Sequence, residues 1–395
     1  MKILYFKWNS FGTEDIEEAL AELGHDLVIV PYDRDDVKVE DTLVGRLIES
    51  IDKEKPDIVF TSNYYPPVSE AAHEKGIRYV SWVYDSPHVA LYSYTTMYET
   101  NTIYVFDREV CDEFNKNKIN TVSYLPLAAN PKRLRTLIED KAGQDLFIKS
   151  RFYNKADIAF VGAMYDEDHT FFRRLTGITD YTRGYLEGII ATQRQVFGYN
   201  FVKSLLRDDI MDDMSRDLPM QPGEGSVASR EYLFSEYCIN REITARERMD
   251  YISAIGKIFS KDGRPGLDLY TGNKDLKIDG VYNHGPIDHY ATAPYVYDKA
   301  KININITLRS IHSGIPLRAF EILGSGGFLL SNYQGDFADC YVDGEDYVSF
   351  SGMEDMLLKI EYYLSHENER KEIAANGLAR TLKMHTYVER LRQVV

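Results

Sequence analysis

Cysteine and long apolar runs are scarce in this sequence, and basic residues are fewer than acidic ones. The chain of 395 residues has three cysteines, and their odd number and wide separation exclude a disulfide framework and a zinc cluster. No window approaches the roughly 18 apolar residues of a membrane-spanning helix. The first residues, MKILYFKW, also lack the features of a signal peptide. We therefore expect a cytoplasmic protein with no membrane insertion.

Acidic residues outnumber basic ones by 62 to 46, so the formal net charge is −16. This charge opposes non-specific binding to a phosphate backbone or an anionic membrane, and we expect no nucleic-acid partner. A small anionic ligand stays compatible with it if positive side chains gather in one place. The apolar content of 44% and charged content of 27% are typical of a folded protein, and the length suits two domains.

Short apolar runs alternate with amphipathic helical segments over the first 130 residues, and the alternation resumes at DIAFVG, residues 157–162. Such alternation predicts parallel sheets with helical crossovers. We expect an α/β protein with two Rossmann-like, doubly wound domains that face a cleft. The expected boundaries are 1–130 for the first domain, 131–156 for a linker, 157–375 for the second domain and 376–395 for a helical tail. A helical insertion is expected at about 168–260.

Ligands of open parallel sheets bind beyond the carboxyl ends of the strands, and this rule selects a few loops. The selected residues in the first domain are Asn9, Asn63, Tyr64, Asp85 and His88, and in the second Gly162, Lys274, Gly285 and the segment 309–321. His88 is a candidate to orient an acceptor or to assist proton transfer, with Asp85 beside it. The alternative is that both residues only cap and shape their loop.

The segment SIHSGIPLRAFEILGSGGFLL, residues 310–330, predicts a loop followed by a short helix and an apolar strand. Free amides around Ser313 and Gly314, together with the helix dipole, would bind an anion such as phosphate. Arg318 lies in the first turn, where a cation is unfavourable unless an anion or Glu321 neutralises it. Because residues three apart can pair on a helix, a ligand site and a structural ion pair both stay open. Arg309 and Lys274 are further candidate cations for the anion.

Two other patterns leave alternatives open. The run ININIT alternates Asn303 and Asn305 with isoleucines, so one face of this strand points at a polar cleft or, from an edge position, at solvent. The acidic runs Asp33-Arg34-Asp35 and Asp166-Glu167-Asp168 could hold a divalent metal, but we interpret both as loop charges. No GxGxxG follows the first strand and no GxxxxGK[ST] occurs, which removes the main support for a dehydrogenase or a P-loop NTPase.

Several blocks resemble a known family. SGIPLRAFEILGSGGFLLSN, DGEDYVSF and IEYYLSHENERKEIAANG resemble the carboxyl-terminal domain of the spore-protein CgeB-type family of glycosyltransferase-like proteins. DIVFTSNYYPPVSEAAHEKGIRYVSWVYDSP and YLPLAAN resemble the domain that precedes it. The resemblance spans nearly the whole chain and is weakest over the helical insertion.

The resemblance implies a GT-B fold, a nucleoside diphosphate sugar held mainly by the second domain, an acceptor protein or glycan at the first, and no obligatory metal or other cofactor. In related retaining transferases a glutamate of this helix binds the ribose, and Glu321 matches it. A second glutamate, two turns earlier near the donor sugar, has Ser313 at the matching position. Arg318 would then act as a catalytic residue that stabilises the departing diphosphate. His88 and Asp85 would be the catalytic residues that face the sugar.

A second interpretation is compatible with the same sequence. Since Ser313 replaces the earlier glutamate of the family pattern, the chain could be a catalytically silent protein that binds a nucleotide sugar or serves as a scaffold. A sugar-nucleotide epimerase of the same fold is a further alternative, which would change the donor without an acceptor.

Overall fold

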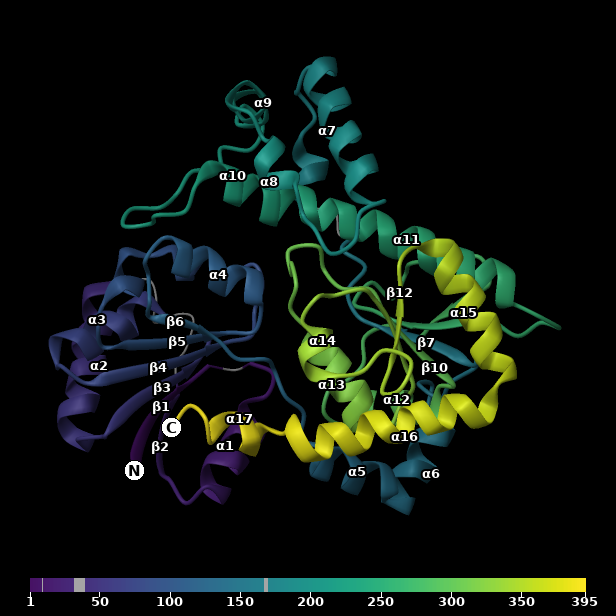
Figure 1. Ribbon diagram of the computed structural model, residues 1–395, viewed down its shortest axis with the longest axis horizontal. Helices are drawn as coiled ribbons and strands as arrows, with labels where there is room; N and C mark the ends of the chain where they lie inside the picture. The colour runs from purple at the N-terminus through teal and green to yellow at the C-terminus, as the bar shows by residue number, and fades with distance from the viewer. Residues whose placement is uncertain (9, 32–39, 167–169) are drawn as a thin grey trace. The chain divides into compact units, whose positions relative to one another are not determined.

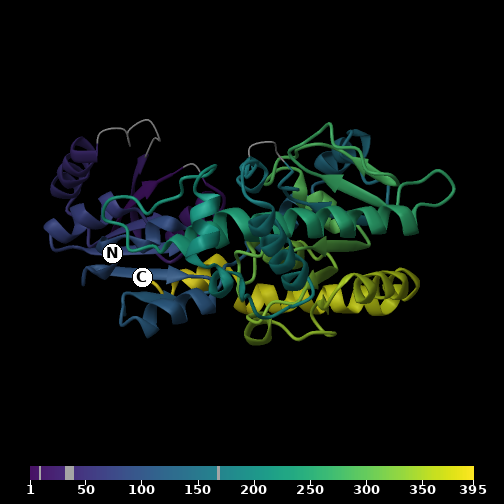
Figure 2. The same ribbon diagram turned by 90° about the horizontal axis from the view of Figure 1, so that it is seen from above.

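The computed structural model describes residues 1–8, 10–31, 40–166 and 170–395, and its chain divides into two units. Unit 1 comprises Met1–Leu127, Pro222–Ser229 and Thr386–Val395, and unit 2 comprises Ala128–Gln221 and Arg230–His385. Each unit contains a parallel sheet of six strands flanked by helices (Figures 1 and 2). The prediction of an α/β fold with two Rossmann-like domains is confirmed.

The sheet of unit 1 has the order β2-β1-β3-β4-β5-β6, and every neighbouring pair is parallel. The order reverses between β1 and β3, which makes this the topological switch point, where open sheets bind ligands. Ile3, Leu4 and Tyr5 of β1 are fully buried, as expected for a strand covered on both faces. The strands are β1 Lys2–Lys7, β2 Asp26–Pro31, β3 Ile58–Ser62, β4 Arg78–Val83, β5 Asn101–Val105 and β6 Val122–Tyr124.

The helices of unit 1 include one that comes from the carboxyl terminus of the chain. α17 packs against α1, and the ring of its Tyr387 lies 5.7 Å from that of Trp82. A Cβ on Gly12, whose φ is +82°, would lie 2.6 Å from the Tyr387 hydroxyl, so a glycine fits this close approach. The helices are α1 Thr13–Glu22, α2 Glu40–Glu54, α3 Pro66–Glu74, α4 Arg108–Lys116, α17 Tyr387–Leu391 and the 3-10 turns Val89–Tyr92 and Tyr94–Met97.

The sheet of unit 2 has the order β12-β11-β10-β7-β8-β9, again with parallel neighbours. Counted from β7, this is the order 3-2-1-4-5-6 of dinucleotide-binding folds, and its switch point lies between β7 and β10. The strands are β7 Ile158–Val161, β8 Leu267–Tyr270, β9 Val281–Asn283, β10 Ile302–Asn305, β11 Leu329–Asn332 and β12 Val348–Phe350.

Helices cover both faces of this second sheet. Ile158 and Phe160 of β7 pack on one face in a core that includes residues of α11 and α15, while Ala159 and Val161 pack on the other face with α6 and α12. This alternation follows from the period of two along a strand. The helices are α5 Pro131–Glu139, α6 Lys141–Lys149, α11 Asn240–Phe259, α12 Ala293–Lys299, α13 Leu317–Gly324, α14 Phe337–Cys340, α15 Met353–Ser365 and α16 Glu367–Met384.

A helical segment inserted between β7 and β8 has its own apolar core. α11, the long green helix of Figure 1, joins this insertion to the sheet, because Ile243 belongs to the core of the insertion and Ile252 to the core of the sheet. The other elements of the insertion are the 3-10 turn Phe172–Arg174, α7 Asp180–Gln193, α8 Val202–Leu205, α9 Asp208–Met214, α10 Arg230–Tyr232 and the π-helix Leu233–Ile239.

The polar strand β10 occupies an interior place in the sheet, between β7 and β11, so the edge position considered for it is wrong. Asn303 and Asn305 are both buried. The Asn303 amide donates to the carbonyl of Tyr297 at 3.0 Å, and that of Asn305 donates to the Ser331 hydroxyl at 2.9 Å. The Nδ2 groups of both side chains therefore bind protein oxygens, whereas their Oδ1 atoms are buried without a hydrogen-bond partner among the described residues.

Candidate functional site

Arg318 lies against the loop that follows β7, at the switch point of unit 2. Its Nη1 donates to the carbonyl of Val161 at 2.6 Å, and its guanidinium carbon is 5.2 Å from the centre of the Phe160 ring. A Cβ on Gly162 would lie 2.5 Å from Nη1, so the glycine leaves the room that the guanidinium fills. Arg318 and Gly162, both predicted as donor-binding residues, are thus brought together.

No carboxylate of the described residues forms an ion pair with Arg318, and Glu321 in particular does not. The structural ion pair considered between these two side chains is therefore absent. Burial lowers the pKa of the Arg318 guanidinium, since charge is disfavoured where water is excluded. A cation in such a place is balanced most simply by an anionic ligand.

Glu321 pairs with His289, a residue that the sequence did not single out. The His289 Nε2 lies 2.5 Å from Oε1 of Glu321. Burial acts to lower the pKa of His289, but the charge and hydrogen bond of Glu321 act the other way, and the net shift is upward. The other oxygen of Glu321, Oε2, is buried and has no hydrogen-bond partner among the described residues.

The hydroxyl of Tyr297 is a second buried polar atom without a hydrogen-bond partner in the described part of the chain. Burial is the main cause of the raised pKa of Tyr297, and the charges of Glu321 and Arg318 also act on it. Buried polar atoms are nearly always hydrogen-bonded, so Oε2 of Glu321 and the hydroxyl of Tyr297 could take hydrogen bonds from a bound group.

The loops after β8 and β9 lie side by side at the same edge of the sheet. A Cβ on Gly285, whose φ is +79°, would lie 3.3 Å from Cβ of Lys274, and Lys274 is exposed. The Gly285 amide donates to the side chain of Asn283 at 2.9 Å. The amide of Asn273 donates to Asp166 at 2.8 Å, which ties the loop after β8 to the loop after β7. Lys274 and Gly285 thus belong to the predicted edge.

The loop before α13 is fixed by the residues that follow β11. Ser313 and Gly314 are buried. The Gly314 carbonyl accepts from the amide of Gln334 at 3.0 Å, and the Ser313 carbonyl accepts from the Asp336 amide at 3.0 Å. Because the carbonyls are bound in this way, the amides at the start of α13 are held in one arrangement.

Arg309 is engaged elsewhere, and the expectation that it binds the donor diphosphate is not supported. Its guanidinium pairs with Glu247 at 2.5 Å, donates to the carbonyl of Val196 at 2.9 Å and lies 4.6 Å from the Phe197 ring. The Glu247 side chain is 3% exposed. Arg309 therefore holds the helical insertion against the loop after β10.

In unit 1, the predicted residues Asn63 and Asp85 form one network at the carboxyl ends of β3 and β4. Asn63, with φ of +66°, donates from Nδ2 to Asp85 at 2.9 Å. Its Oδ1 accepts from the backbone amides of Tyr84 and Asp85 at 3.0 and 3.2 Å. Asn63 is therefore a residue that shapes the loop of Asp85. Asn9, the other predicted acceptor-side asparagine, lies outside the described residues.

The side chain of Tyr64 is fully buried and its hydroxyl is 2.7 Å from that of Thr95. The expectation that this side chain faces an acceptor is therefore wrong, because the ring completes the core of unit 1. Its backbone carbonyl is nevertheless part of the site, since it lies 2.9 Å from Nε2 of His88.

His88 is held by that carbonyl with one ring nitrogen. Since a carbonyl only accepts, Nε2 carries a hydrogen, and the neutral ring keeps the lone pair of Nδ1 for another partner. Burial lowers the pKa of His88 although Tyr64 and Asp85 act to raise it. The ring is thus neutral near pH 7, which suits a hydrogen-bond acceptor or a base.

The acidic runs do not offer a metal site in the part of the chain that can be described. Among the described residues, no three His, Cys, Asp or Glu side chains gather closely enough to hold a metal ion. Asp33, Asp35, Glu167 and Asp168 lie outside the described residues. In the same described part, no helix combines the length and the apolar character that crossing a membrane requires.

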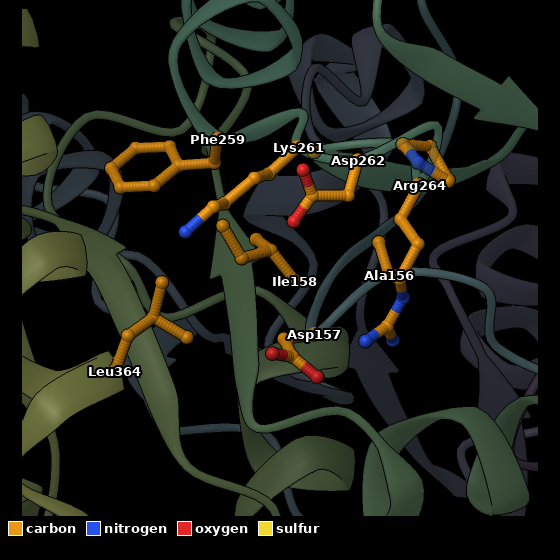
Figure 3. A pocket seen from close by; sticks show the side chains of 10 residues that line it. Ala156, Asp157, Ile158, Phe259, Lys261, Asp262, Arg264 and Leu364 are labelled. Atoms are coloured by element: carbon orange, nitrogen blue, oxygen red, sulfur yellow. The ribbon is translucent and has the colours of Figure 1, made fainter.

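A pocket of about 250 Å³ lies at the opposite, amino-terminal edge of the unit 2 sheet. Figure 3 shows Asp157, Lys261, Asp262 and Arg264 around it. Asp157 directly precedes β7 and pairs with Lys301 at 3.0 Å. Because open parallel sheets bind ligands at the carboxyl ends of their strands, we do not assign the donor to this pocket.

Three residues near Arg318 were missed by the sequence analysis. His289 and Tyr297 stand in segments with no motif, and only the fold brings them near Glu321. Arg248, which lies on α11 and contacts the loop after β7, was not predicted because it belongs to no recognised binding motif. The sequence feature that could have indicated it is a charged residue on a buried face of a helix.

Comparison with known proteins gives a family match for the carboxyl-terminal part of the chain. Residues 258–395 match a family model described as glycosyl transferase-like. No curated protein matches the chain.

Solved structures with the same fold cover the entire chain at low identity. A glycosyltransferase from Rickettsia africae has a TM-score of 0.54 and 11% identity, with 99% of this chain and 96% of that one covered. HepE of Anabaena, solved with UDP-glucose, has a TM-score of 0.54 and 9% identity, with 100% and 98% covered. A UDP-forming α,α-trehalose-phosphate synthase from Burkholderia vietnamiensis has a TM-score of 0.56 and 10% identity, with 100% and 97% covered.

These likenesses establish the fold, and the family model describes residues 258–395 as glycosyl transferase-like. The chain has the GT-B architecture, and the prediction of a glycosyltransferase is confirmed for the glycosyl transferase-like domain of residues 258–395.

Proposed function

We propose that this protein transfers a sugar from a nucleoside diphosphate sugar to a hydroxyl or amide of an acceptor protein or glycan, with retention and without a metal, as in the CgeB-type family that it resembles. The observation that carries the proposal is the position of Arg318. It is a cation without a carboxylate partner among the described residues, beside Gly162 at the carboxyl end of β7. Diphosphate sugars need such a group, because negative charge grows on the departing diphosphate.

The remaining contacts of the donor follow from the neighbours of Arg318. The buried Oε2 of Glu321 and hydroxyl of Tyr297 lack partners in the described chain, and the hydroxyls of a ribose would supply hydrogen bonds to them. Backbone amides of the loop before α13, around Gly314, and the ammonium of Lys274 would contact phosphate oxygens. His289 keeps Glu321 in place, since it pairs with the other carboxylate oxygen.

Unit 1 would contribute the proton chemistry of the acceptor. The lone pair of Nδ1 on His88 is available because Nε2 is bound to the Tyr64 carbonyl, and the lowered pKa keeps the ring neutral. His88 would accept a hydrogen bond or proton from the acceptor hydroxyl. Asp85, held by Asn63, would fix a sugar hydroxyl near it.

The test is a thermal-shift and calorimetric screen with UDP, GDP, dTDP, ADP and their sugars, followed by assays of free sugar release and transfer. A ligand that binds only the folded protein raises its apparent stability. We expect one nucleoside diphosphate to bind in the micromolar range and its sugar to be released slowly. Binding and release should survive EDTA. Absence of binding by all four diphosphates, or loss with EDTA that manganese restores, contradicts the proposal.

One observation favours a second candidate, a protein of the same fold that binds a nucleotide sugar without catalysis. Ser313 stands where the family pattern has a glutamate near the donor sugar, and it is buried. This candidate predicts tight binding of a diphosphate sugar with no release or transfer of sugar over hours. The release assay therefore decides between the two.

A further inference from the structure

Arg248 is the most deeply buried arginine at the switch point of unit 2. It lies on α11 and is 2% exposed. Its Nε and Nη2 donate to the carbonyl of Ile306 at 3.1 and 2.5 Å, and its Nη1 donates to the carbonyl of Ala163 at 2.5 Å. One guanidinium thus joins two loops of the sheet.

Those two loops are the ones that the topology selects. Ala163 is in the loop after β7, Ile306 directly follows β10, and β7 and β10 are the neighbours between which the strand order reverses. A ligand of an open α/β sheet binds between the carboxyl ends of these strands. Arg248 therefore fixes both sides of the place where a ligand is expected.

Arg248 and Arg318 form a pair of like charges. Their guanidinium carbons lie 5.3 and 5.2 Å from the centre of the same Phe160 ring. Burial, with the charge of Arg318 contributing, lowers the pKa of Arg248 to about 10, so it is charged at neutral pH. Among the described residues, neither guanidinium has a carboxylate ion-pair partner.

The surroundings hold Arg248 in one orientation. Its guanidinium lies 4.9 Å from the centre of the Tyr165 ring, besides its contact with Phe160. Tyr165 has φ of +54°, a left-handed conformation that costs a non-glycine residue free energy and clusters at functional sites. A cation that aromatic rings and carbonyls fix in this way has little freedom to lose when an anion arrives.

The neighbouring Arg309 differs from Arg248 because it forms an ion pair with a carboxylate. Arg309 lies in the same region and has the carboxylate of Glu247 at 2.5 Å. Glu247 and Arg248 are consecutive residues of α11, yet the carboxylate pairs with Arg309 and leaves Arg248 without one. In a chain with 62 acidic residues, the buried Arg248 and the half-buried Arg318 have no carboxylate ion-pair partner among the described residues, and an external anion would balance them.

We propose that Arg248 and Arg318 together form the diphosphate site, in which Arg318 contacts the phosphate oxygens and Arg248 is a positioning residue. Arg248 holds the loops of Ala163 and Ile306 and supplies the second positive charge. This inference rests on the proposed function. It adds Arg248, a residue of the helical insertion, to the proposed donor site.

The experiment compares three ligands of increasing charge on variants of one helix. Calorimetric titration measures the affinities of the preferred nucleoside, its monophosphate and its diphosphate for the wild type, Arg248→Met and Arg246→Met. Arg246 is the matched control, because it is on α11 two residues earlier and already pairs with Glu187 and Glu242. All affinities are measured on the folded fraction.

We expect Arg248→Met to lose about tenfold or more in diphosphate affinity and less than threefold in nucleoside affinity, with the monophosphate between. A unit charge several ångström from a diphosphate has an effect of this size at an effective dielectric constant of about 20. Arg246→Met should change all three affinities by less than threefold. A merely structural Arg248 would weaken all three ligands equally, and that outcome overturns the inference.

Arg248→Lys keeps the experiment decisive if Arg248→Met does not fold. It retains the charge but cannot span both carbonyls, so we expect affinity for inorganic pyrophosphate to fall about threefold to tenfold and nucleoside affinity to stay unchanged. Equal changes for both probes would overturn the inference here too. Failure of the wild type to bind any nucleoside diphosphate would instead refute the proposed function, so the two failures are distinguishable.

Discussion

The loops at the carboxyl ends of the strands differ in charge between the two units. In unit 1, the lowered pKa keeps His88 neutral near pH 7, and Asn63 binds the carboxylate of Asp85. In unit 2, Arg318 has no carboxylate partner in the described chain, and polar atoms of Glu321 and Tyr297 are unpartnered. A neutral histidine near a hydrogen-bonded carboxylate suits proton transfer, whereas a cation without a carboxylate partner suits an anion. The proposed function accordingly gives the proton chemistry to unit 1 and the diphosphate to unit 2.

Replacing His88 should produce the largest effect. Because general acid–base catalysis contributes about 10²- to 10⁴-fold, we expect His88→Ala to lower turnover at least about a hundredfold and to leave nucleoside diphosphate affinity unchanged. In the wild type, the lowered pKa of His88 places the acid limb of the rate below the ordinary histidine pKa of about 6.5. Initial rates between pH 5 and 8, with calorimetric titration, check both points.

Tyr64→Phe is the matched control for that experiment. It removes only the hydroxyl that contacts Thr95 and keeps the carbonyl that holds His88, so turnover should stay within about threefold of the wild type. If His88→Ala loses nucleotide affinity as much as turnover, unit 1 binds the donor and the comparison between the units fails.

Replacing Arg318 should have the next largest effect, on binding. Hydrogen bonds to charged groups contribute about 1.5–3 kcal/mol, so Arg318→Ala should weaken nucleoside diphosphate binding tenfold to over a hundredfold. The free nucleoside should bind nearly as before. Stability without ligand should not fall, since the substitution removes an unbalanced charge.

Arg309→Met provides the contrast within unit 2. It breaks a buried ion pair with Glu247, which typically costs about 3–5 kcal/mol of stability, while the folded fraction should keep its affinity for diphosphate. If instead Arg318→Ala lowers the melting temperature and leaves affinity intact, the site at Gly162 is structural.

Glu321→Gln should have a smaller effect on binding. The substitution exchanges a charged acceptor for a neutral one, a difference of about 1 kcal/mol per hydrogen bond, so affinity should fall roughly fivefold. Because the carboxylate is assigned to the ribose, the loss should be the same for nucleoside and diphosphate. A loss confined to the diphosphate would place Glu321 at the phosphates and contradict the assignment. Titration of both ligands decides.

The fold was predictable because strand and helix signals are local. Apolar runs such as DIAFVG and TIYVFD specify buried strands wherever they pack, and their alternation with helices is enough to predict parallel sheets. The return of α17 to unit 1 could not be foreseen, since the contact of Tyr387 with Gly12 joins the two ends of the chain. Pairing over such a separation leaves no periodic signal in the sequence.

The site was predictable only where a strand end marks it. Gly162 and Arg318 could be placed at one strand end because a loop after a strand and a short helix are local features, and the structure brings the two residues together. The ion pair of Arg309 could not be predicted, because its carboxylate partner, Glu247, is 62 positions away. His289 was missed for the same reason, since a histidine 32 positions from Glu321 forms no motif. Ion pairs between distant segments decide which charges are free, and sequence spacing does not report them.

The smallest expected effect concerns the pairing of His289 with Glu321 and depends on pH. The folded-state pKa of His289 is raised, so the pair contributes stability that is fully present below the ordinary pKa of about 6.5 and is lost as pH rises through the folded-state value. His289→Asn should therefore lower the melting temperature more at pH 6 than at pH 9. For a domain of this size, about 1 kcal/mol corresponds to about 2–4 °C. Glu321→Gln should remove the same pH-dependent part, and the double variant should add nothing to it, because both changes break one interaction. Equal decreases in melting temperature at pH 6 and pH 9 would mean that His289 stabilises the protein only by packing. The orientation of Glu321 toward a ribose would then depend on other residues.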